Sequence, residues 1–186
     1  DSRISEESKP FVHGCWNVKV GMVTNFFRNL TITTETETQR IGRDIASLVQ
    51  VGDIISLSGD LGTGKTVMAR ALIQALGGRG EVPSPTFNLV QSYDLGSLIV
   101  HHLDLYRIEN PEDAFELGVE ELFATGVSLI EWPDRLGTYI PKDRLNLEFS
   151  HPSGRSQINT VRCISIEGLG NWKPRMENLF QILDDG

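Results

Sequence analysis

The sequence predicts an α/β fold, in which a mixed β-sheet is flanked by helices and followed by an antiparallel C-terminal extension. Strand-like apolar runs alternate with helical patterns from Asn29 to Pro141, which is typical of α/β proteins. After Pro141, segments alternate between apolar and polar residues, as antiparallel strands do. The length of 186 residues fits one domain, which we place at residues 28–186. Residues 1–27 lack a clear period and are expected to form a leader or extension of uncertain order.

The first elements are indicated by a helix cap and by apolar spacing. Residues 30–33 alternate like a short strand. Thr34, followed three residues later by Glu37, forms a capping box and predicts the start of a helix. Apolar residues then recur at the spacing of one helix face, at Ile41, Ile45, Leu48 and Val49.

The middle of the chain predicts a buried strand, a helix and a pair of strands. The continuous apolar run at residues 54–58 is typical of a strand that is covered on both faces. A helix is expected through residues 67–76, where a pair of glycines stops it. Two strands at residues 87–93 and 98–103 then flank a turn at residues 94–97.

The C-terminal half begins with a strong helix signal. Asn110 is placed as a cap and Pro111 in the first turn, so we expect one helix running to about Phe123. Residues 127–130 predict another buried strand. Two alternating strands are then expected at residues 145–149 and 161–166, joined by a polar turn at residues 152–154. An amphipathic helix is expected at residues 176–183.

Charge and composition exclude several classes of protein. The net charge is −8 and no run of lysine or arginine occurs, which disfavours tight direct binding of DNA or tRNA. A partner could still bring the nucleic acid. No apolar run approaches the ~18 residues of a membrane helix. The two cysteines, Cys15 and Cys163, are far apart and have no CxxC spacing, so buried or idle thiols and a cytoplasmic location are expected.

One short loop points directly to nucleotide binding. The run Gly59-Asp60-Leu61-Gly62-Thr63-Gly64-Lys65-Thr66 satisfies the pattern G-x-x-x-x-G-K-S/T at every fixed position. A buried strand precedes it and a helix follows, which is the arrangement that directs backbone N–H groups at phosphate. Lys65 is expected to meet the β- and γ-phosphates, and Thr66 to offer its hydroxyl to magnesium. The fold is therefore predicted to be P-loop NTPase-like.

Two acidic residues stand at the ends of predicted strands. Asp104 follows residues 98–103, and Glu131 follows residues 127–130. Magnesium in P-loop sites is held by carboxylates in such positions, so we expect both side chains near the metal. An acid at a strand end can otherwise be a helix cap or a solvated charge. Together with Lys65 they form the predicted catalytic set, although which acid activates water stays open.

Further residues are candidates for sensing or contacting the nucleotide. Thr86 lies in a stiff, proline-bearing loop, where it would suit a switch that senses the γ-phosphate; a plain rigid turn is the alternative. Trp132 could stack on the base, or it could equally be a partly buried core tryptophan. His101 and His102 adjoin Asp104, but neighbours on a strand point to opposite faces, so no metal cluster is expected.

Four segments occur in order within about residues 30–150: GDLGTGKT, SPTF followed by LV and Tyr93, HLDLYR, and EWPDR. Together they resemble the TsaE family, the ATPase subunit of the bacterial machinery that makes threonylcarbamoyladenosine in tRNA. The resemblance implies ATP as nucleotide and magnesium held by Thr66, Asp104 and Glu131, with Thr86 in a switch-like loop.

The resemblance also implies a mode of action. It implies weak hydrolysis alone and productive turnover with the tRNA threonylcarbamoyl-transferase subunit and its inactive paralogue. The ends of the chain match no motif of the family. Some relatives are fused to a C-terminal phosphotransferase, so the chain could be part of a longer product.

Two other functions share the phosphate loop. A small-molecule kinase would transfer the γ-phosphate to an acceptor; Arg135 and Arg144 could serve it, but no compact lid sequence is evident. A regulatory GTPase would need a guanine-reading NKxD motif, which the chain lacks.

Overall fold

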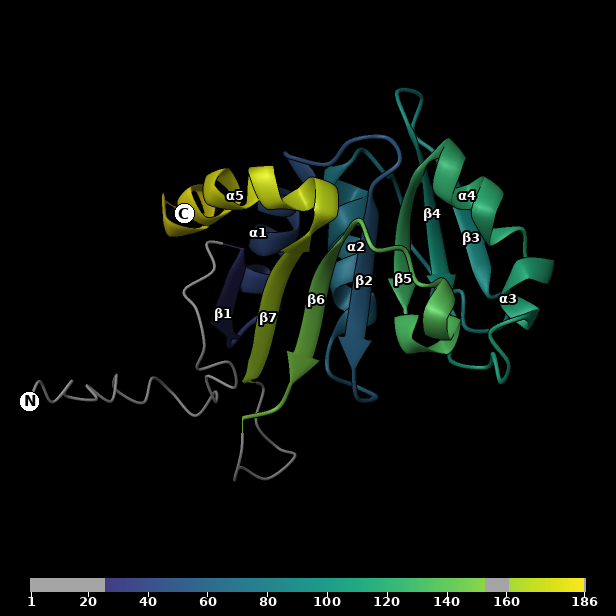
Figure 1. Ribbon diagram of the computed structural model, residues 1–186. Helices are drawn as coiled ribbons and strands as arrows, with labels where there is room; N and C mark the ends of the chain where they lie inside the picture. The colour runs from purple at the N-terminus through teal and green to yellow at the C-terminus, as the bar shows by residue number, and fades with distance from the viewer. Residues whose placement is uncertain (1–25, 153–160, 186) are drawn as a thin grey trace, which may run out of the picture.

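The computed structural model describes residues 26–152 and 161–185 and contains a seven-stranded sheet flanked by helices (Figure 1). The strands are β1 Phe27–Ile32, β2 Ile54–Gly59, β3 Val90–Asp94, β4 Ile99–Asp104, β5 Val127–Glu131, β6 Arg144–Ser150 and β7 Arg162–Leu169. The α-helices are α1 Glu35–Ala46, α2 Lys65–Ala75, α3 Asp113–Glu116, α4 Val119–Thr125 and α5 Met176–Asp185, and the 3₁₀ segments are η1 Pro133–Tyr139 and η2 Gly170–Arg175. The predicted mixed α/β fold is confirmed.

The order of the strands is β1-β7-β6-β2-β5-β4-β3. The four central strands β6, β2, β5 and β4 run parallel to one another. On one side of them, β3 pairs antiparallel with β4. On the other side, β7 lies between β6 and β1 and pairs antiparallel with both. The carboxyl ends of β2, β4 and β5 therefore meet at one edge of the sheet, where ligands of open α/β sheets bind.

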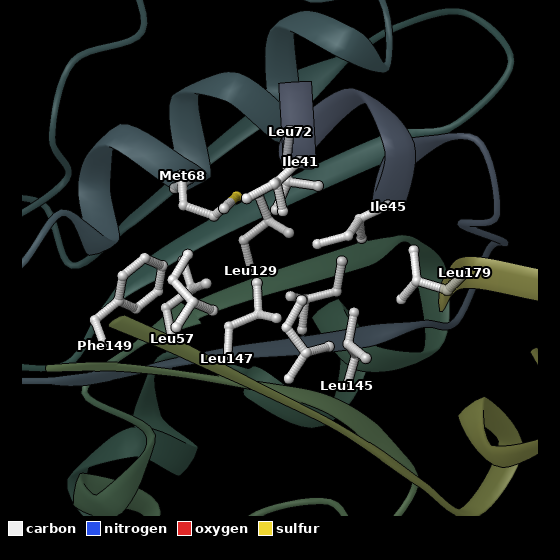
Figure 2. Packing of buried hydrophobic residues seen from close by; sticks show 14 of the residues in the cluster. Ile41, Ile45, Leu57, Met68, Leu72, Leu129, Leu145, Leu147, Phe149 and Leu179 are labelled. Atoms are coloured by element: carbon white, nitrogen blue, oxygen red, sulfur yellow. The ribbon is translucent and has the colours of Figure 1, made fainter. Parts of the chain in front are cut away.

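Helices α1, α2 and α5 cover one face of the sheet. Figure 2 shows Ile41 of α1 and Met68 of α2 directed at strand residues such as Leu57 and Leu129. These four side chains are at most 2% exposed, so their burial is close to complete. A smaller apolar cluster lies among β4, β5, the short helices and η1, and includes Leu103, Ile130 and Leu136.

The capping box at the start of α1 forms as predicted. The Thr34 hydroxyl accepts from the Glu37 backbone N–H at 3.1 Å, and the Glu37 carboxylate accepts from the Thr34 N–H at 3.1 Å. The predicted helix face is buried at Ile41 and Ile45, whereas Leu48 and Val49 lie beyond the end of α1 and are partly buried.

Three sequence-based boundaries are wrong. The strand expected at residue 87 begins only at Val90, because Leu89 has a φ of 62° and its N–H donates to the Pro85 carbonyl. The helix expected from Asn110 to Phe123 is split into α3 and α4, because Gly118 adopts a left-handed φ of 69°. The strand expected at residues 30–33 instead spans β1, Phe27–Ile32.

The C-terminal extension follows the prediction. Strands β6 and β7 pair antiparallel, and α5 buries Met176, Leu179, Phe180 and Leu183. Most of the turn expected at residues 152–154 lies outside the described residues. Cys163 is buried in β7, as the expectation of a buried or idle thiol allows, but it is bonded in a disulfide and is not a free thiol. Cys15 lies outside the described residues. Within the described ranges, every helix is too short or too polar to cross a membrane.

Candidate functional site

The glycine loop joins the carboxyl end of β2 to the first residue of α2. Gly59 has a φ of 125°, and a Cβ there would come within 2.2 Å of the Phe149 carbonyl oxygen, so only glycine fits. Gly64 caps α2 with a φ of 108° and has open space around its Cα. The loop thus leaves open space beside Gly64 at the N-terminal end of α2, as anion binding requires.

Lys65 is folded into the loop that contains it. Its ammonium donates to the carbonyl of Gly59 at 2.7 Å and to that of Asp60 at 2.8 Å. The side chain is buried, and burial lowers its pKa, while Glu131 and Asp104 act in the opposite direction. The cation is therefore held among oxygen atoms at the mouth of the loop.

Thr66 and Glu131 are in direct contact. The Thr66 hydroxyl donates to Oε2 of Glu131 at 2.9 Å, although the two residues come from α2 and β5. Oε1 of the same carboxylate accepts from Nε2 of His102 at 2.9 Å. Glu131 is 2% exposed and lies deep in the site.

Asp104 and Thr86 form the second pair of the site. The Thr86 hydroxyl donates to Oδ2 of Asp104 at 2.6 Å, and the Tyr106 N–H donates to Oδ1 at 3.1 Å. Asp104 lies directly opposite Glu131 in the parallel pairing of β4 with β5. The loop that carries Thr86 is thereby fastened to the strand end that carries Asp104.

The predicted residues gather around one pocket of about 310 Å³. This volume lies within the range of small-molecule sites. The pocket is lined by nine residues that the sequence singled out, namely Leu61, Gly62, Gly64, Lys65, Thr66, Thr86, Asp104, Glu131 and Trp132, and by Val67 and Tyr106 in addition. Three predicted loop residues do not line it: Gly59 and Asp60 hold Lys65 through their carbonyls, and the Thr63 hydroxyl donates to the Asp60 carbonyl at 2.7 Å.

Trp132 forms part of the pocket wall. Its backbone has a φ of 58°, and its ring lies 4.0 Å below the Lys65 ammonium and 5.0 Å from the Tyr106 ring. The side chain is partly buried and packs against the smaller apolar cluster, as the alternative of a partly buried core tryptophan expects, while stacking on a base stays a prediction.

Sequence reasoning overlooked two contributors to the site. Tyr106 lines the pocket and is 46% exposed, and His102 contacts Glu131 from the interior. The alternation of strand residues carried a signal for His102, because it lies two positions before Asp104 and so on the same face of β4. His101 points to the other face, where it contacts Ser92 and Thr125.

The donor atoms suit a magnesium ion in this pocket. Thr66, Asp104 and Glu131 present hydroxyl and carboxylate oxygens, the ligand type that magnesium prefers, and they present no nitrogen or sulfur donor to it. Within the described residues, no cluster of three or more His, Cys, Asp or Glu forms a self-sufficient metal site. This composition fits an ion that keeps several waters and phosphate oxygens as ligands.

Comparison with known proteins identifies the same protein family from several directions. The family model described as Threonylcarbamoyl adenosine biosynthesis protein TsaE matches residues 32–158. The tRNA threonylcarbamoyladenosine biosynthesis protein TsaE of Rickettsia conorii is 38% identical over 121 residues, covering 63% of this chain and 69% of the relative. The protein of that name from Bacillus subtilis is 37% identical over 112 residues, covering 60% and 70% respectively.

A solved structure extends the comparison to the fold. The crystal structure of YdiB from Bacillus subtilis superposes with a TM-score of 0.67 at 29% identity, covering 86% of this chain and 95% of YdiB. The matched range contains the phosphate loop, Asp104 and Glu131. The family model spans well over half of the chain, and the chain therefore belongs to the TsaE family.

Proposed function

We propose that this chain is a magnesium- and ATP-binding P-loop ATPase that serves the threonylcarbamoyladenosine modification of tRNA. The carrying observation is the meeting of Lys65, Thr66, Asp104 and Glu131 around one pocket, with Thr86 fastened to Asp104. The names of its relatives support the role in tRNA modification.

The loop and Lys65 would hold the triphosphate. The ammonium now donates to two backbone carbonyls, which are weaker acceptors than phosphate oxygens. A bound nucleotide would exchange these contacts for charge-assisted ones, while the N-terminal end of α2 adds backbone N–H donors. The missing guanine-reading motif favours ATP over GTP.

Thr66, Asp104 and Glu131 would hold magnesium, which when bound offsets the negative charge of the phosphates. In the protein itself, each carboxylate is already oriented by hydrogen bonds, Asp104 by Thr86 and Tyr106 and Glu131 by Thr66. One of the two acids would orient the attacking water and accept its proton.

Thr86 would sense whether a γ-phosphate is present in the pocket. Its hydroxyl donates to Asp104, and it lies in the loop that connects α2 with β3. A γ-phosphate in the pocket would compete for this hydroxyl and shift the loop, as in other switch segments. Because the net charge is −8, we expect tRNA to be held by partner proteins, namely the threonylcarbamoyl-transferase subunit and its inactive paralogue.

The deciding experiment measures ATP hydrolysis by the purified chain, alone and with the transferase pair. We expect slow hydrolysis alone and a clear rise with both partners, and no such rise with Lys65→Ala. A rate that stays unchanged when the partners are added would contradict the proposal. Rapid phosphorylation of a small acceptor without partners would establish the kinase alternative.

A further inference from the structure

His102 is a buried titratable residue to which the proposed reaction assigns no task. It lies in β4 and is fully buried. Its Nε2 lies 2.9 Å from Oε1 of Glu131, and because a carboxylate only accepts, Nε2 must be the donor. Its other ring nitrogen, Nδ1, is buried and has no hydrogen-bond partner among the described residues. The polar contact with Glu131 is therefore what distinguishes this side chain from an apolar one of similar size.

Three side chains from three elements form a continuous chain of contacts. Thr66 of α2 donates to Oε2 of Glu131, and His102 of β4 donates to Oε1. Each of the two carboxylate oxygens of Glu131 thus has its own hydrogen-bond donor. Thr66 and Glu131 line the pocket, whereas His102 does not.

Glu131 needs such restraint because Asp104 faces it. The two residues are direct partners in the pairing of β4 with β5, and like charges placed opposite each other repel. A carboxylate held only by Thr66 could rotate away from Asp104 and leave the pocket. The bond from His102 limits this rotation from the side that faces the interior.

His101 provides a built-in comparison. It is the adjacent residue of the same strand and is also buried, at 5% exposure. Its ring contacts Ser92 and Thr125 on the opposite face, away from the pocket. A substitution of His101 disturbs the same strand without touching Glu131.

We propose that His102 is a positioning residue that holds Glu131 in the orientation in which its second oxygen meets Thr66. This rests on the proposed function, because the orientation matters through the magnesium that Thr66 and Glu131 would hold. Partners that orient metal ligands typically change metal affinity or activity by about 10–100-fold when removed.

The test measures binding of a non-hydrolysable ATP analogue by calorimetry, once with Mg²⁺ and once with EDTA. For His102→Leu we expect the affinity gained through Mg²⁺ to fall by about 10-fold or more, and the affinity in EDTA to stay unchanged. His102→Gln, which carries an N–H donor at a comparable reach, should recover most of the loss. His101→Leu should keep the Mg²⁺-dependent gain of the wild type.

Two results would overturn the inference. One is a His102→Leu protein that gains as much affinity from Mg²⁺ as the wild type. The other is an equal loss in Mg²⁺ and in EDTA, which marks a general structural role.

A second measurement uses the wild-type protein and no nucleotide. Nitrogen NMR of the imidazole should show that Nε2 of His102 carries a hydrogen and donates it in a hydrogen bond. An Nε2 without hydrogen would refute the contact. This result does not depend on whether His102→Leu folds. If the wild type binds the analogue in neither medium, the proposed function fails, while this measurement still decides the contact between His102 and Glu131.

Discussion

Lys65 combines burial with several polar contacts of its ammonium group. It is 4% exposed, and its ammonium is bonded by two carbonyls of its own loop and lies over the ring of Trp132. Burial alone would favour loss of the proton, but the acids Glu131 and Asp104 support the charged form. The net effect lowers the pKa of Lys65, and its two hydrogen bonds to loop carbonyls place Nζ at the mouth of the loop, where phosphate would bind.

Replacing Lys65 tests the phosphate site directly. We expect Lys65→Ala to weaken ATP binding by at least about 10–100-fold, because a hydrogen bond to a charged group contributes about 1.5–3 kcal/mol. Calorimetry with ATP and Mg²⁺ measures the change. Lys142→Ala, at an exposed position outside the pocket, is the control and should bind normally. Equal affinities of the two variants would remove Lys65 from the site.

Asp104 can be separated from Lys65 by the reaction step that it affects. We expect Asp104→Ala to slow hydrolysis by about 10-fold or more, since an oriented carboxylate and the anchor of Thr86 are both lost. Binding of ATP in EDTA should be nearly unchanged. Asp94→Ala, at the exposed end of the adjacent strand β3, serves as control. Full hydrolytic activity of Asp104→Ala would exclude this role.

At the scale of elements, the capping box predicted at the start of α1 is present in the folded protein. The Glu37 carboxylate accepts hydrogen bonds from Thr33 and Thr34. These bonds hold the pKa of Glu37 below its ordinary value of 4.5, and the bond from the Thr33 backbone N–H has the largest effect. Because the folded pKa is lowered, the contribution of Glu37 to stability is fully present above pH 4.5. It is lost as the pH falls through the lower, folded pKa.

The pH dependence of unfolding tests this cap. We expect Glu37→Gln to be less stable than the wild type at pH 7 by up to about 1 kcal/mol, because glutamine keeps an acceptor but loses the charge near the helix start. The difference should shrink at pH 3 in urea unfolding. Glu35→Gln, in the same first turn but outside the box, is the control. A difference between wild type and Glu37→Gln that is constant with pH would contradict the linkage.

Other elements show where local reasoning stopped. The signals at Asn110 and Pro111 favoured one helix, but the chain breaks at Gly118, whose left-handed φ of 69° separates α3 from α4, and α4 packs against β5. Glycine is compatible with both a helix and a left-handed turn, so only the packing of the two segments decides between them. The late start of β3 at Val90 is likewise set by a backbone turn, because Leu89 has a φ of 62° and its N–H donates to the Pro85 carbonyl.

At the scale of the whole molecule, one ion pair joins the C-terminal segment to the core. Arg175 of η2 makes two hydrogen bonds with Asp53, at 2.6 and 2.7 Å, and a third with the Leu48 carbonyl at 2.9 Å. Both side chains are at most 15% exposed. Asp53 also accepts from the Gln50 N–H, so the pair links the turn before β2 to the segment before α5.

Breaking this pair should destabilise the entire domain. We expect Arg175→Met to lower the free energy of unfolding by about 2–4 kcal/mol, because Asp53 is left as a mostly buried charge without its partner. Urea unfolding measures the loss. Arg43→Met, at an exposed position of α1, should change stability by no more than about 0.5 kcal/mol. A loss for Arg175→Met as small as that of the control would show that the link carries no stability.

The sequence by itself determined the local features of this protein: the glycine loop between a strand and a helix, the capped start of α1 and the apolar faces of α1, α2 and α5. Each depends on residues a few positions apart, so spacing alone reveals it. The tertiary structure decided which distant residues meet. Asp104 faces Glu131, Thr66 and His102 reach the same carboxylate, and Arg175 reaches Asp53, because the order and register of the strands place them there. Strand order is a property of the packed sheet, and no local pattern specifies it.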